Sequence, residues 1–155
     1  TRLYFKDCYI DGTTDFIFGP STALFENCMI HSKRNSYVTA ASTPKEAKYG
    51  YIFKHCKLTA EPGVDKVYLG RPWRPYAYTL FIECELGKHI VPAGWHNWGK
   101  QSNEETARYM EYKNTGEGAN VSERVAWSKQ LTKKEAEAVT VDAIFGTQSN
   151  WNPID

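Results

Sequence analysis

Four copies of one six-residue pattern decide the fold: FKDCYI at residues 5–10, FENCMI at 25–30, FKHCKL at 53–58 and FIECEL at 81–86. In each copy a phenylalanine stands three residues before a cysteine, and an isoleucine or leucine stands two residues after it. Because strand side chains alternate between faces, the cysteine and the aliphatic residue share a face, and the phenylalanine lies across a bend or bulge. A unit that recurs every 20 to 28 residues indicates a solenoid of stacked coils.

The segments between these copies are short and strand-like. They are DFIFG at 15–19, SYVTAA at 36–41, KVYLG at 66–70 and YTLFIEC at 78–84, and loops such as STPKEAK at 42–48 and AEPGVD at 60–65 connect them. The sequence therefore predicts an all-β protein folded as a parallel β-helix.

The cysteines should form a ladder in this fold, because matching side chains on neighbouring coils lie about 4.8 Å apart. Free thiols behave there as small hydrophobic groups. A disulfide within the ladder is an open alternative. A metal site has less support, since no CxxC pair or histidine cluster accompanies the cysteines. The four histidines are scattered, and we expect each to be structural or solvent-facing: His31, His55, His89 and His96.

The repeat pattern divides the chain into coils over residues 1–95 and a tail over residues 96–155 within one domain. Residues 102–119 read as a loop that leads into one strand near 108–113. The capping box Thr132 to Glu135 predicts a helix over 132–139. This tail should pack along or cap the solenoid, since an open end exposes unpaired strand edges. The sequon at Asn120 is best explained by chance.

Charge and hydropathy exclude some partners. The chain has 155 residues, with 19 Lys and Arg against 18 Asp and Glu, so its net charge of +1 creates no field that would recruit nucleic acid or a membrane surface. No apolar stretch reaches the roughly 18 residues that a membrane helix needs. The aromatic fraction of 14% admits sugar stacking, although core packing is the commoner use of such residues.

One carboxylate stands beside an apolar strand, in GTTDFIFG at residues 12–19. Asp15 lies 13 residues before Cys28, and Arg71 lies 13 residues before Cys84, so both fall on corresponding stretches of coils two rungs apart. Two rungs span about 10 Å, much of which an arginine side chain covers. A guanidinium keeps a half-buried carboxylate ionised and oriented, which suits an oxygen nucleophile. A salt bridge without chemistry is the alternative.

Three motifs carry a resemblance to a known family. DCYIDGTTDFIFG at 7–19, YLGRPWRPYAYTLF at 68–81 and PAGWHNW at 92–98 resemble the pectin methylesterases, and so do EYKNTGEGA at 111–119, RVAWSKQL at 124–131 and FGTQSNW at 145–151. The resemblance implies a right-handed parallel β-helix that hydrolyses the methyl esters of pectin, a methylated homogalacturonan, without a metal or cofactor.

The resemblance also implies site residues. Asp15 matches the nucleophile and Arg71 the cation that holds it. Trp73 matches a residue that lines the sugar groove, and Phe18 and Trp98 fall where family members place apolar groups against the polymer. We expect Phe16 and Ile17 to be core residues and Trp95 to be structural, with a role in the groove as the open alternative for Trp95.

In the family's usual mechanism the carboxylate attacks the ester, methanol leaves with a proton from a second aspartate, and water releases the product. That aspartate and the glutamines of the oxyanion hole belong to motifs that precede DCYI, and neither Asp7 nor Asp11 matches them. We therefore expect the C-terminal part of a longer esterase, partnered by missing N-terminal coils, with little activity and low stability on its own. Monomeric assembly and a secreted or periplasmic location follow from the resemblance.

Two other functions stay open. Pectate lyases and polygalacturonases use the same polymer, but they need calcium ligands or an aspartate cluster that the sequence does not display. A non-catalytic β-helix could instead bind sugar through a row of rings, namely Tyr37, Tyr68, Trp73, Tyr76 and Tyr78.

Overall fold

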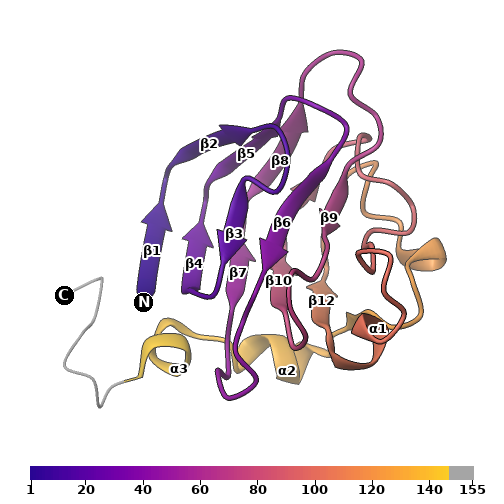
Figure 1. Cartoon of the computed structure of the whole chain (residues 1–155). Helices are drawn as coiled ribbons and strands as arrows, with labels where there is room; N and C mark the ends of the chain where they lie inside the picture. The colour runs from indigo at the N-terminus through magenta and orange to yellow at the C-terminus, as the bar shows by residue number, and fades with distance from the viewer. Residues whose placement is uncertain (147–155) are drawn as a thin grey trace.

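The chain winds through three parallel β-sheets in a computed structural model that describes residues 1–146 (Figure 1). The six-stranded sheet holds β1 (Arg2–Lys6), β4 (Thr22–Glu26), β7 (Tyr51–Lys54), β10 (Tyr78–Ile82), β12 (Arg108–Tyr112) and β13 (Lys129–Gln130). The four-stranded sheet holds β2 (Tyr9–Gly12), β5 (Met29–Ser32), β8 (Lys57–Ala60) and β11 (Glu85–Leu86). The three-stranded sheet holds β3 (Ile17–Gly19), β6 (Tyr37–Ala41) and β9 (Tyr68–Gly70). Successive strands enter successive sheets, so the predicted all-β parallel β-helix is confirmed.

The repeat phenylalanines form a stack inside the coils. The ring centroids of Phe5 and Phe25 lie 4.9 Å apart, those of Phe25 and Phe53 4.5 Å, and those of Phe53 and Phe81 4.4 Å. Interplanar angles of 7 to 9° show that the rings are nearly parallel. Each ring therefore covers the faces of its neighbours and excludes water along the core.

The cysteines form a second ladder beside the rings. Three of them are buried, and each of these thiols donates a hydrogen bond to the carbonyl of the repeat phenylalanine one coil earlier: Cys28 to Phe5, Cys56 to Phe25 and Cys84 to Phe53. All four thiols are free. Three of the four cysteines thus lie in the buried ladder that the sequence predicts, while Cys8, in the first coil, is only partly buried.

A bend precedes each cysteine. The residue before it has a positive φ in every copy, at Asp7 (57°), Asn27 (53°), His55 (54°) and Glu83 (49°). This left-handed residue turns the chain from the six-stranded sheet into the four-stranded sheet. The bend explains how a phenylalanine and a cysteine at odd spacing both point inward.

The coils continue past residue 95, where the sequence pattern ends. Strand β12 pairs in parallel with β10, and Glu111 stands opposite Phe81 in the register. Lys113 repeats the positive φ at 45°, and Asn114, in the position of the cysteine, accepts a hydrogen bond from the backbone of Cys84. A fifth coil is therefore present, with different residues at the repeat positions.

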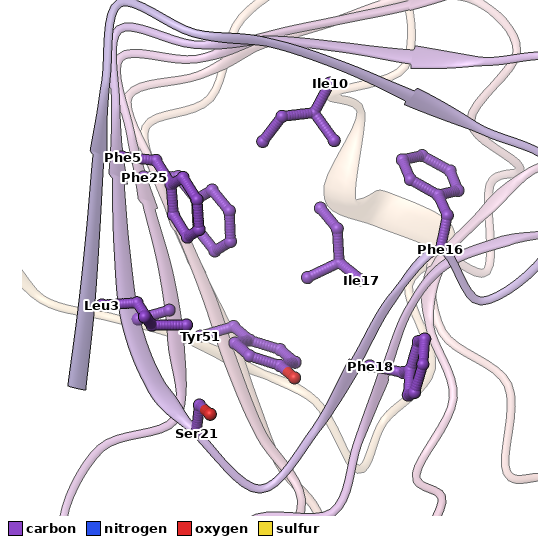
Figure 2. A pocket seen from close by; sticks show the side chains of 10 residues that line it. Leu3, Phe5, Ile10, Phe16, Ile17, Phe18, Ser21, Phe25 and Tyr51 are labelled. Carbon is purple, nitrogen blue, oxygen red and sulfur yellow. The ribbon is translucent and has the colours of Figure 1, made fainter. Parts of the chain in front are cut away.

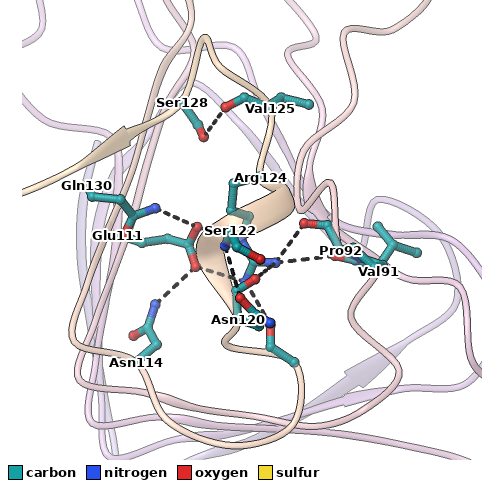
Figure 3. Close-up of polar contacts among 11 residues, drawn as sticks. Val91, Pro92, Glu111, Asn114, Asn120, Ser122, Arg124, Val125, Ser128 and Gln130 are labelled. Atoms are coloured by element: carbon teal, nitrogen blue, oxygen red, sulfur yellow. Dashed lines mark hydrogen bonds and ion pairs between the residues drawn. The ribbon is translucent and has the colours of Figure 1, made fainter.

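A buried ion pair closes the phenylalanine stack at this fifth coil (Figure 3). The side chains of Glu111 and Arg124 are 1% and 3% exposed. Arg124 donates from Nε to Oε2 at 2.8 Å and from Nη2 to Oε1 at 3.1 Å. Asn114 and Gln130 donate further hydrogen bonds to the same carboxylate, each at 3.3 Å. A buried carboxylate needs such full pairing, and here it ends an apolar ladder.

Short helices follow the strands: α1 (Asn103–Thr106), the 3-10 helix η1 (Val121–Glu123), α2 (Lys133–Glu137) and α3 (Val141–Phe145). The predicted capping box is present, since the Thr132 side chain accepts from Glu135 and the Glu135 side chain accepts from Thr132. The helix is shorter than the predicted range of 132–139, and the sequence analysis missed α1 and α3. None of the helices in residues 1–146 is long and apolar enough to cross a membrane.

Helices α2 and α3 lie along the outer face of the six-stranded sheet, with α3 nearer the N-terminus (Figure 1). Val139 and Ile144 pack with Leu24, Ile52 and Leu80, which point away from the phenylalanine stack. The backbone carbonyl of the last α3 residue also accepts a hydrogen bond from Arg2 at 2.9 Å. The tail thus runs back over the coils and ties the last to the first.

The first coil is open at its other end. An apolar cavity of about 280 Å³ lies there (Figure 2), lined mostly by side chains of the first two coils: Leu3, Phe5, Ile10, Phe16, Ile17, Phe18, Ser21, Ala23, Phe25 and Tyr51. Leu3 is 38% exposed at this end. The apolar edge that the sequence predicts for the first coil is therefore visible in the structure.

The ion pair at the fifth coil predicts an asymmetry between variants. Arg124→Leu should lower the free energy of unfolding by about 3–5 kcal/mol, because it leaves a buried carboxylate without its cation. The double variant Glu111→Phe with Arg124→Leu should recover most of that loss, since it extends the ring stack with apolar groups. Urea denaturation measures both. A double variant no more stable than Arg124→Leu alone would contradict this account.

Candidate active site

The carboxylate of Asp15 and the guanidinium of Arg71 meet, as the counting from the cysteines predicts. Arg71 donates from Nε to Oδ1 of Asp15 at 3.1 Å and from Nη2 to Oδ2 at 2.6 Å. The side chain of Arg71 is 20% exposed and that of Asp15 is 19% exposed. Asp15 precedes β3 and Arg71 follows β9, with β6 between them. The backbone N–H groups of both residues bond to carbonyls of β6, at Tyr37 and Thr39. Strand register therefore sets their separation.

Two glycines make this approach possible. Asp15 has a φ of 49°, and Phe16 beside it packs directly over Gly12, where a Cβ atom would lie 2.3 Å from that of Phe16. A Cβ atom at Gly70 would lie 2.2 Å from Oγ1 of Thr39. These contacts explain the glycines of GTTDFIFG and LGRPW, because each lets the chain pass close to its neighbour at the site.

The faces of the guanidinium are also covered. The Cζ atom of Arg71 lies 3.8 Å from the ring centroid of Tyr37 and 3.8 Å from that of Trp98. The two rings stack on the cation while its edge bonds to Asp15, so two rings and a carboxylate together restrain the guanidinium. The carboxylate in turn is held by two parallel hydrogen bonds and keeps a fixed orientation.

Three exposed rings accompany the pair. Phe18 is 62% exposed, Trp73 40% and Trp98 37%. Phe18 and Trp73 contact each other edge to face, with centroids 5.9 Å apart, and Trp98 stacks on Arg71. The five predicted site residues thus form two contacting groups at the three-stranded sheet, Asp15 with Arg71 and Trp98, and Phe18 with Trp73. Exposed rings beside a polar group suit the apolar face of a sugar.

The neighbouring aromatic and aliphatic residues are structural, as predicted. Ile17 is 8% exposed and Trp95 is 1% exposed, with the Trp95 ring stacked on Tyr109 at 4.3 Å. Phe16 is partly buried against the core. The row of rings that the alternative, non-catalytic reading requires for sugar binding is not continuous. Tyr78 is only 7% exposed and packs in the apolar cluster under α2 and α3.

One histidine that the sequence analysis set aside borders the site. His96 contacts the rings of Tyr37 and Tyr68, and its pKa is lowered by burial and by the charge of Arg71. No signal in WHNW reveals this contact, because the tyrosines come from two other coils. The other three histidines lie elsewhere: His31 bonds to Thr59, His55 is exposed in a bend, and burial, together with the charge of His31, lowers the pKa of His89 to about 4.

A metal has no evident ligand set in the described part of the chain. Within residues 1–146, no three side chains of His, Cys, Asp or Glu gather where they could hold an ion. The arrangement present is a carboxylate, a cation and aromatic rings. These features define a parallel β-helix that bears an arginine-held carboxylate near exposed aromatic rings.

Comparison with known proteins supports the same class. A sequence profile of the pectinesterase family matches residues 1–148. Pectinesterase 31 of Arabidopsis thaliana is 44% identical over 136 residues, which cover 87% of this chain and 43% of that protein. A pectin methylesterase from carrot superposes with a TM-score of 0.87 at 33% identity, covering 96% of this chain and 51% of that structure.

A further solved structure, a pectin methylesterase in complex with a hexasaccharide, superposes with a TM-score of 0.82 at 31% identity and covers 98% of this chain and 52% of that one. The chain belongs to the pectinesterase family. It spans about half the length of the relatives that it matches. The FGTQSNW segment of the resemblance ends among residues 147–155, which lie outside the described residues.

The geometry of the pair predicts a stability difference between two arginines of RPWRP. Arg71→Lys should lower the free energy of unfolding by about 1–3 kcal/mol, because lysine makes neither the paired hydrogen bonds nor the two ring contacts. Arg74→Lys is the matched control, since Arg74 is exposed, donates a hydrogen bond to the Trp73 carbonyl and lies 5.3 Å from the centroid of one ring, that of Trp73; its effect should stay within about 0.5 kcal/mol. Denaturant titration compares them, and equal effects would contradict the assigned role of Arg71.

Proposed function

We propose that this chain carries the nucleophile of a pectin methylesterase and that Asp15 attacks the methyl ester of a galacturonate unit. The observation that carries this proposal is the paired hydrogen bonding of Asp15 to Arg71 beside the exposed rings of Phe18 and Trp73. The substrate class follows from family membership and from the relatives named as pectin methylesterases. Because pectin is a cell-wall polymer, the whole protein would act outside the cytoplasm.

The reaction divides into two acyl transfers. A carboxylate oxygen of Asp15 forms a bond to the ester carbonyl carbon, and the bond from that carbon to the methoxy oxygen breaks. The methoxy group takes a proton from an acid and leaves as methanol. Water then gives one proton back to the deprotonated acid as its oxygen bonds to the galacturonate acyl carbon; the bond from that carbon to the Asp15 oxygen breaks, which releases the galacturonate carboxyl group and restores the Asp15 carboxylate. Arg71 stays protonated throughout and orients the nucleophile, so it does not supply the proton.

The acid and the oxyanion donors would come from coils that precede residue 1 in the same protein. Within residues 1–146, the hydrogen-bonded partner of the Asp15 side chain is Arg71, and no second carboxyl group contacts the pair. The apolar cavity at the first coil is lined in part by residues 16–18, which directly follow Asp15, so a preceding coil that filled the cavity would lie beside Asp15. One rung is about 4.8 Å, which brings side chains of that coil within reach of a bound ester.

The nucleophile assignment is tested in a graft that joins the preceding coils of the carrot enzyme to residue 1. Asp15→Asn should lower methanol release from highly methylated pectin at least about a thousandfold, because the amide is a poor nucleophile. Asp11→Asn is the control, since Asp11 is an exposed residue of β2, and it should leave the rate nearly unchanged. Chain shortening instead of methanol release would favour a lyase or galacturonase, and indifference to both substitutions would make Asp15 a scaffold residue.

The contribution of the preceding coils is tested by comparing the graft with the chain of 155 residues alone. The chain alone should release methanol at least about a hundredfold more slowly, because losing a single oxyanion donor costs about that much in other enzymes. Circular dichroism and thermal melts establish that both proteins are folded. Equal rates would show that residues 1–155 hold the acid and the oxyanion donors themselves.

A further inference from the structure

Trp98, whose ring stacks on the Arg71 guanidinium, has a strained backbone conformation. Trp98 has a φ of 63°, in the left-handed region that bulky residues seldom adopt. Its backbone N–H donates a hydrogen bond to Nδ1 of His96 at 3.0 Å. The next N–H, of Gly99, donates to Oδ1 of Asn97 at 2.8 Å. Side chains of the loop itself therefore hold the conformation that places the Trp98 ring on the guanidinium.

The imidazole of His96 also supports the ring on the other face. Tyr37 and Tyr68 stack on each other with centroids 5.2 Å apart. The His96 ring meets both of them edge on, at 5.5 Å and 65° to Tyr37 and at 5.2 Å and 76° to Tyr68. Its backbone N–H donates to the carbonyl of Gly70, the residue before Arg71, at 3.1 Å. One residue thus contacts Tyr37, the loop of Trp98 and the strand end that carries Arg71.

We propose that His96 is a positioning residue. It holds the rings of Tyr37 and Trp98, which stack on the guanidinium of Arg71, and so it fixes that guanidinium and, through it, the Asp15 carboxylate. Its catalytic consequence rests on the proposed function of Asp15. The geometric part of the proposal does not rest on that function, because Tyr37 and Trp98 stack on Arg71 without substrate. His96 touches neither the Asp15 carboxylate nor the reacting ester in this scheme, and it acts only through Tyr37 and Trp98.

Protonation would undo this support. Nδ1 accepts the Trp98 hydrogen bond only while it carries no proton. The groups that face the imidazole are the Tyr37 and Tyr68 rings, the Arg71 cation and, through Asn97, the carboxylate of Glu104, which accepts from that amide at 2.8 Å. Burial and the Arg71 charge lower the pKa of His96, so the support is complete above the ordinary histidine pKa. It is lost as the pH falls through the lowered value.

The test observes Arg71 itself by nuclear magnetic resonance on the chain of 155 residues. Ring currents should displace the Arg71 side-chain signals from those of Arg34, which is exposed. His96→Leu should return them toward the Arg34 positions, because leucine fills space without an acceptor. His96→Asn should keep most of the displacement, since its amide oxygen can take the place of Nδ1. His31→Leu is the matched control, as His31 lies on the four-stranded sheet away from the site, and it should change nothing at Arg71.

A titration of the unsubstituted chain supplies a second readout that needs no variant to fold. The Trp98 N–H and Arg71 signals should shift together as His96 takes up a proton. Protonation of His96 without a change at either residue would overturn the proposal, and so would a folded His96→Leu chain with unchanged Arg71 signals. These outcomes do not depend on catalysis, so they separate failure of this inference from failure of the nucleophile assignment.

Kinetics in the graft link the geometry to turnover. His96→Leu should lower kcat about ten- to a hundredfold with a smaller change in KM, because a misplaced nucleophile loses rate more than binding. It should also remove any acid limb of the pH profile that follows His96, and His96→Asn should rescue most of the rate. Wild-type kcat in a folded His96→Leu graft would overturn the catalytic part of the proposal.

Discussion

The in-register stacking of parallel strands is the constraint on which the whole structure depends. Each coil places its residues over their counterparts about 4.8 Å away, and a side chain therefore meets its equivalent on the next coil. The same register that stacks Phe5, Phe25, Phe53 and Phe81 also sets Asp15 and Arg71 two rungs apart, with β6 bonded to both backbones. The phenylalanine stack and the Asp15–Arg71 pair both follow from the strand register, so a shift in register would disrupt both.

A stack of this kind has two ends, and the chain treats them differently. At the fifth coil, Glu111 takes the place of the next phenylalanine and pairs with Arg124, which gives the ladder a polar end with all its hydrogen bonds made. At the first coil the ladder stays apolar, and Phe18 lines a cavity there. Helices α2 and α3 bind the outer face between these ends. A polar end and an apolar end together give the solenoid a direction in which further coils can add.

The sequence predicted those features that repeat or that can be counted from the repeat. The hexapeptides predicted the β-helix, and equal distances to Cys28 and Cys84 predicted the contact between Asp15 and Arg71. The fifth coil was missed because a carboxylate replaces a ring at Glu111, and its partner Arg124 is visible only in three dimensions. His96 was missed for a similar reason, since its contacts come from separate coils. The helix α3 was missed because its residues gain their apolar partners from the distant strand face.

The central claim is that strand register holds an oriented carboxylate near the exposed rings that we propose bind the sugar, and a crystal structure with substrate tests it most directly. The Asp15→Asn form of the grafted protein, soaked with a methyl-esterified oligogalacturonate, should bind the sugar against Phe18, Trp73 and Trp98. An ester carbonyl carbon should lie within about 3.5 Å of the side-chain oxygen at position 15, the separation expected of reacting atoms. An oligosaccharide bound on another face, or with its ester carbons far from that oxygen, would contradict the account.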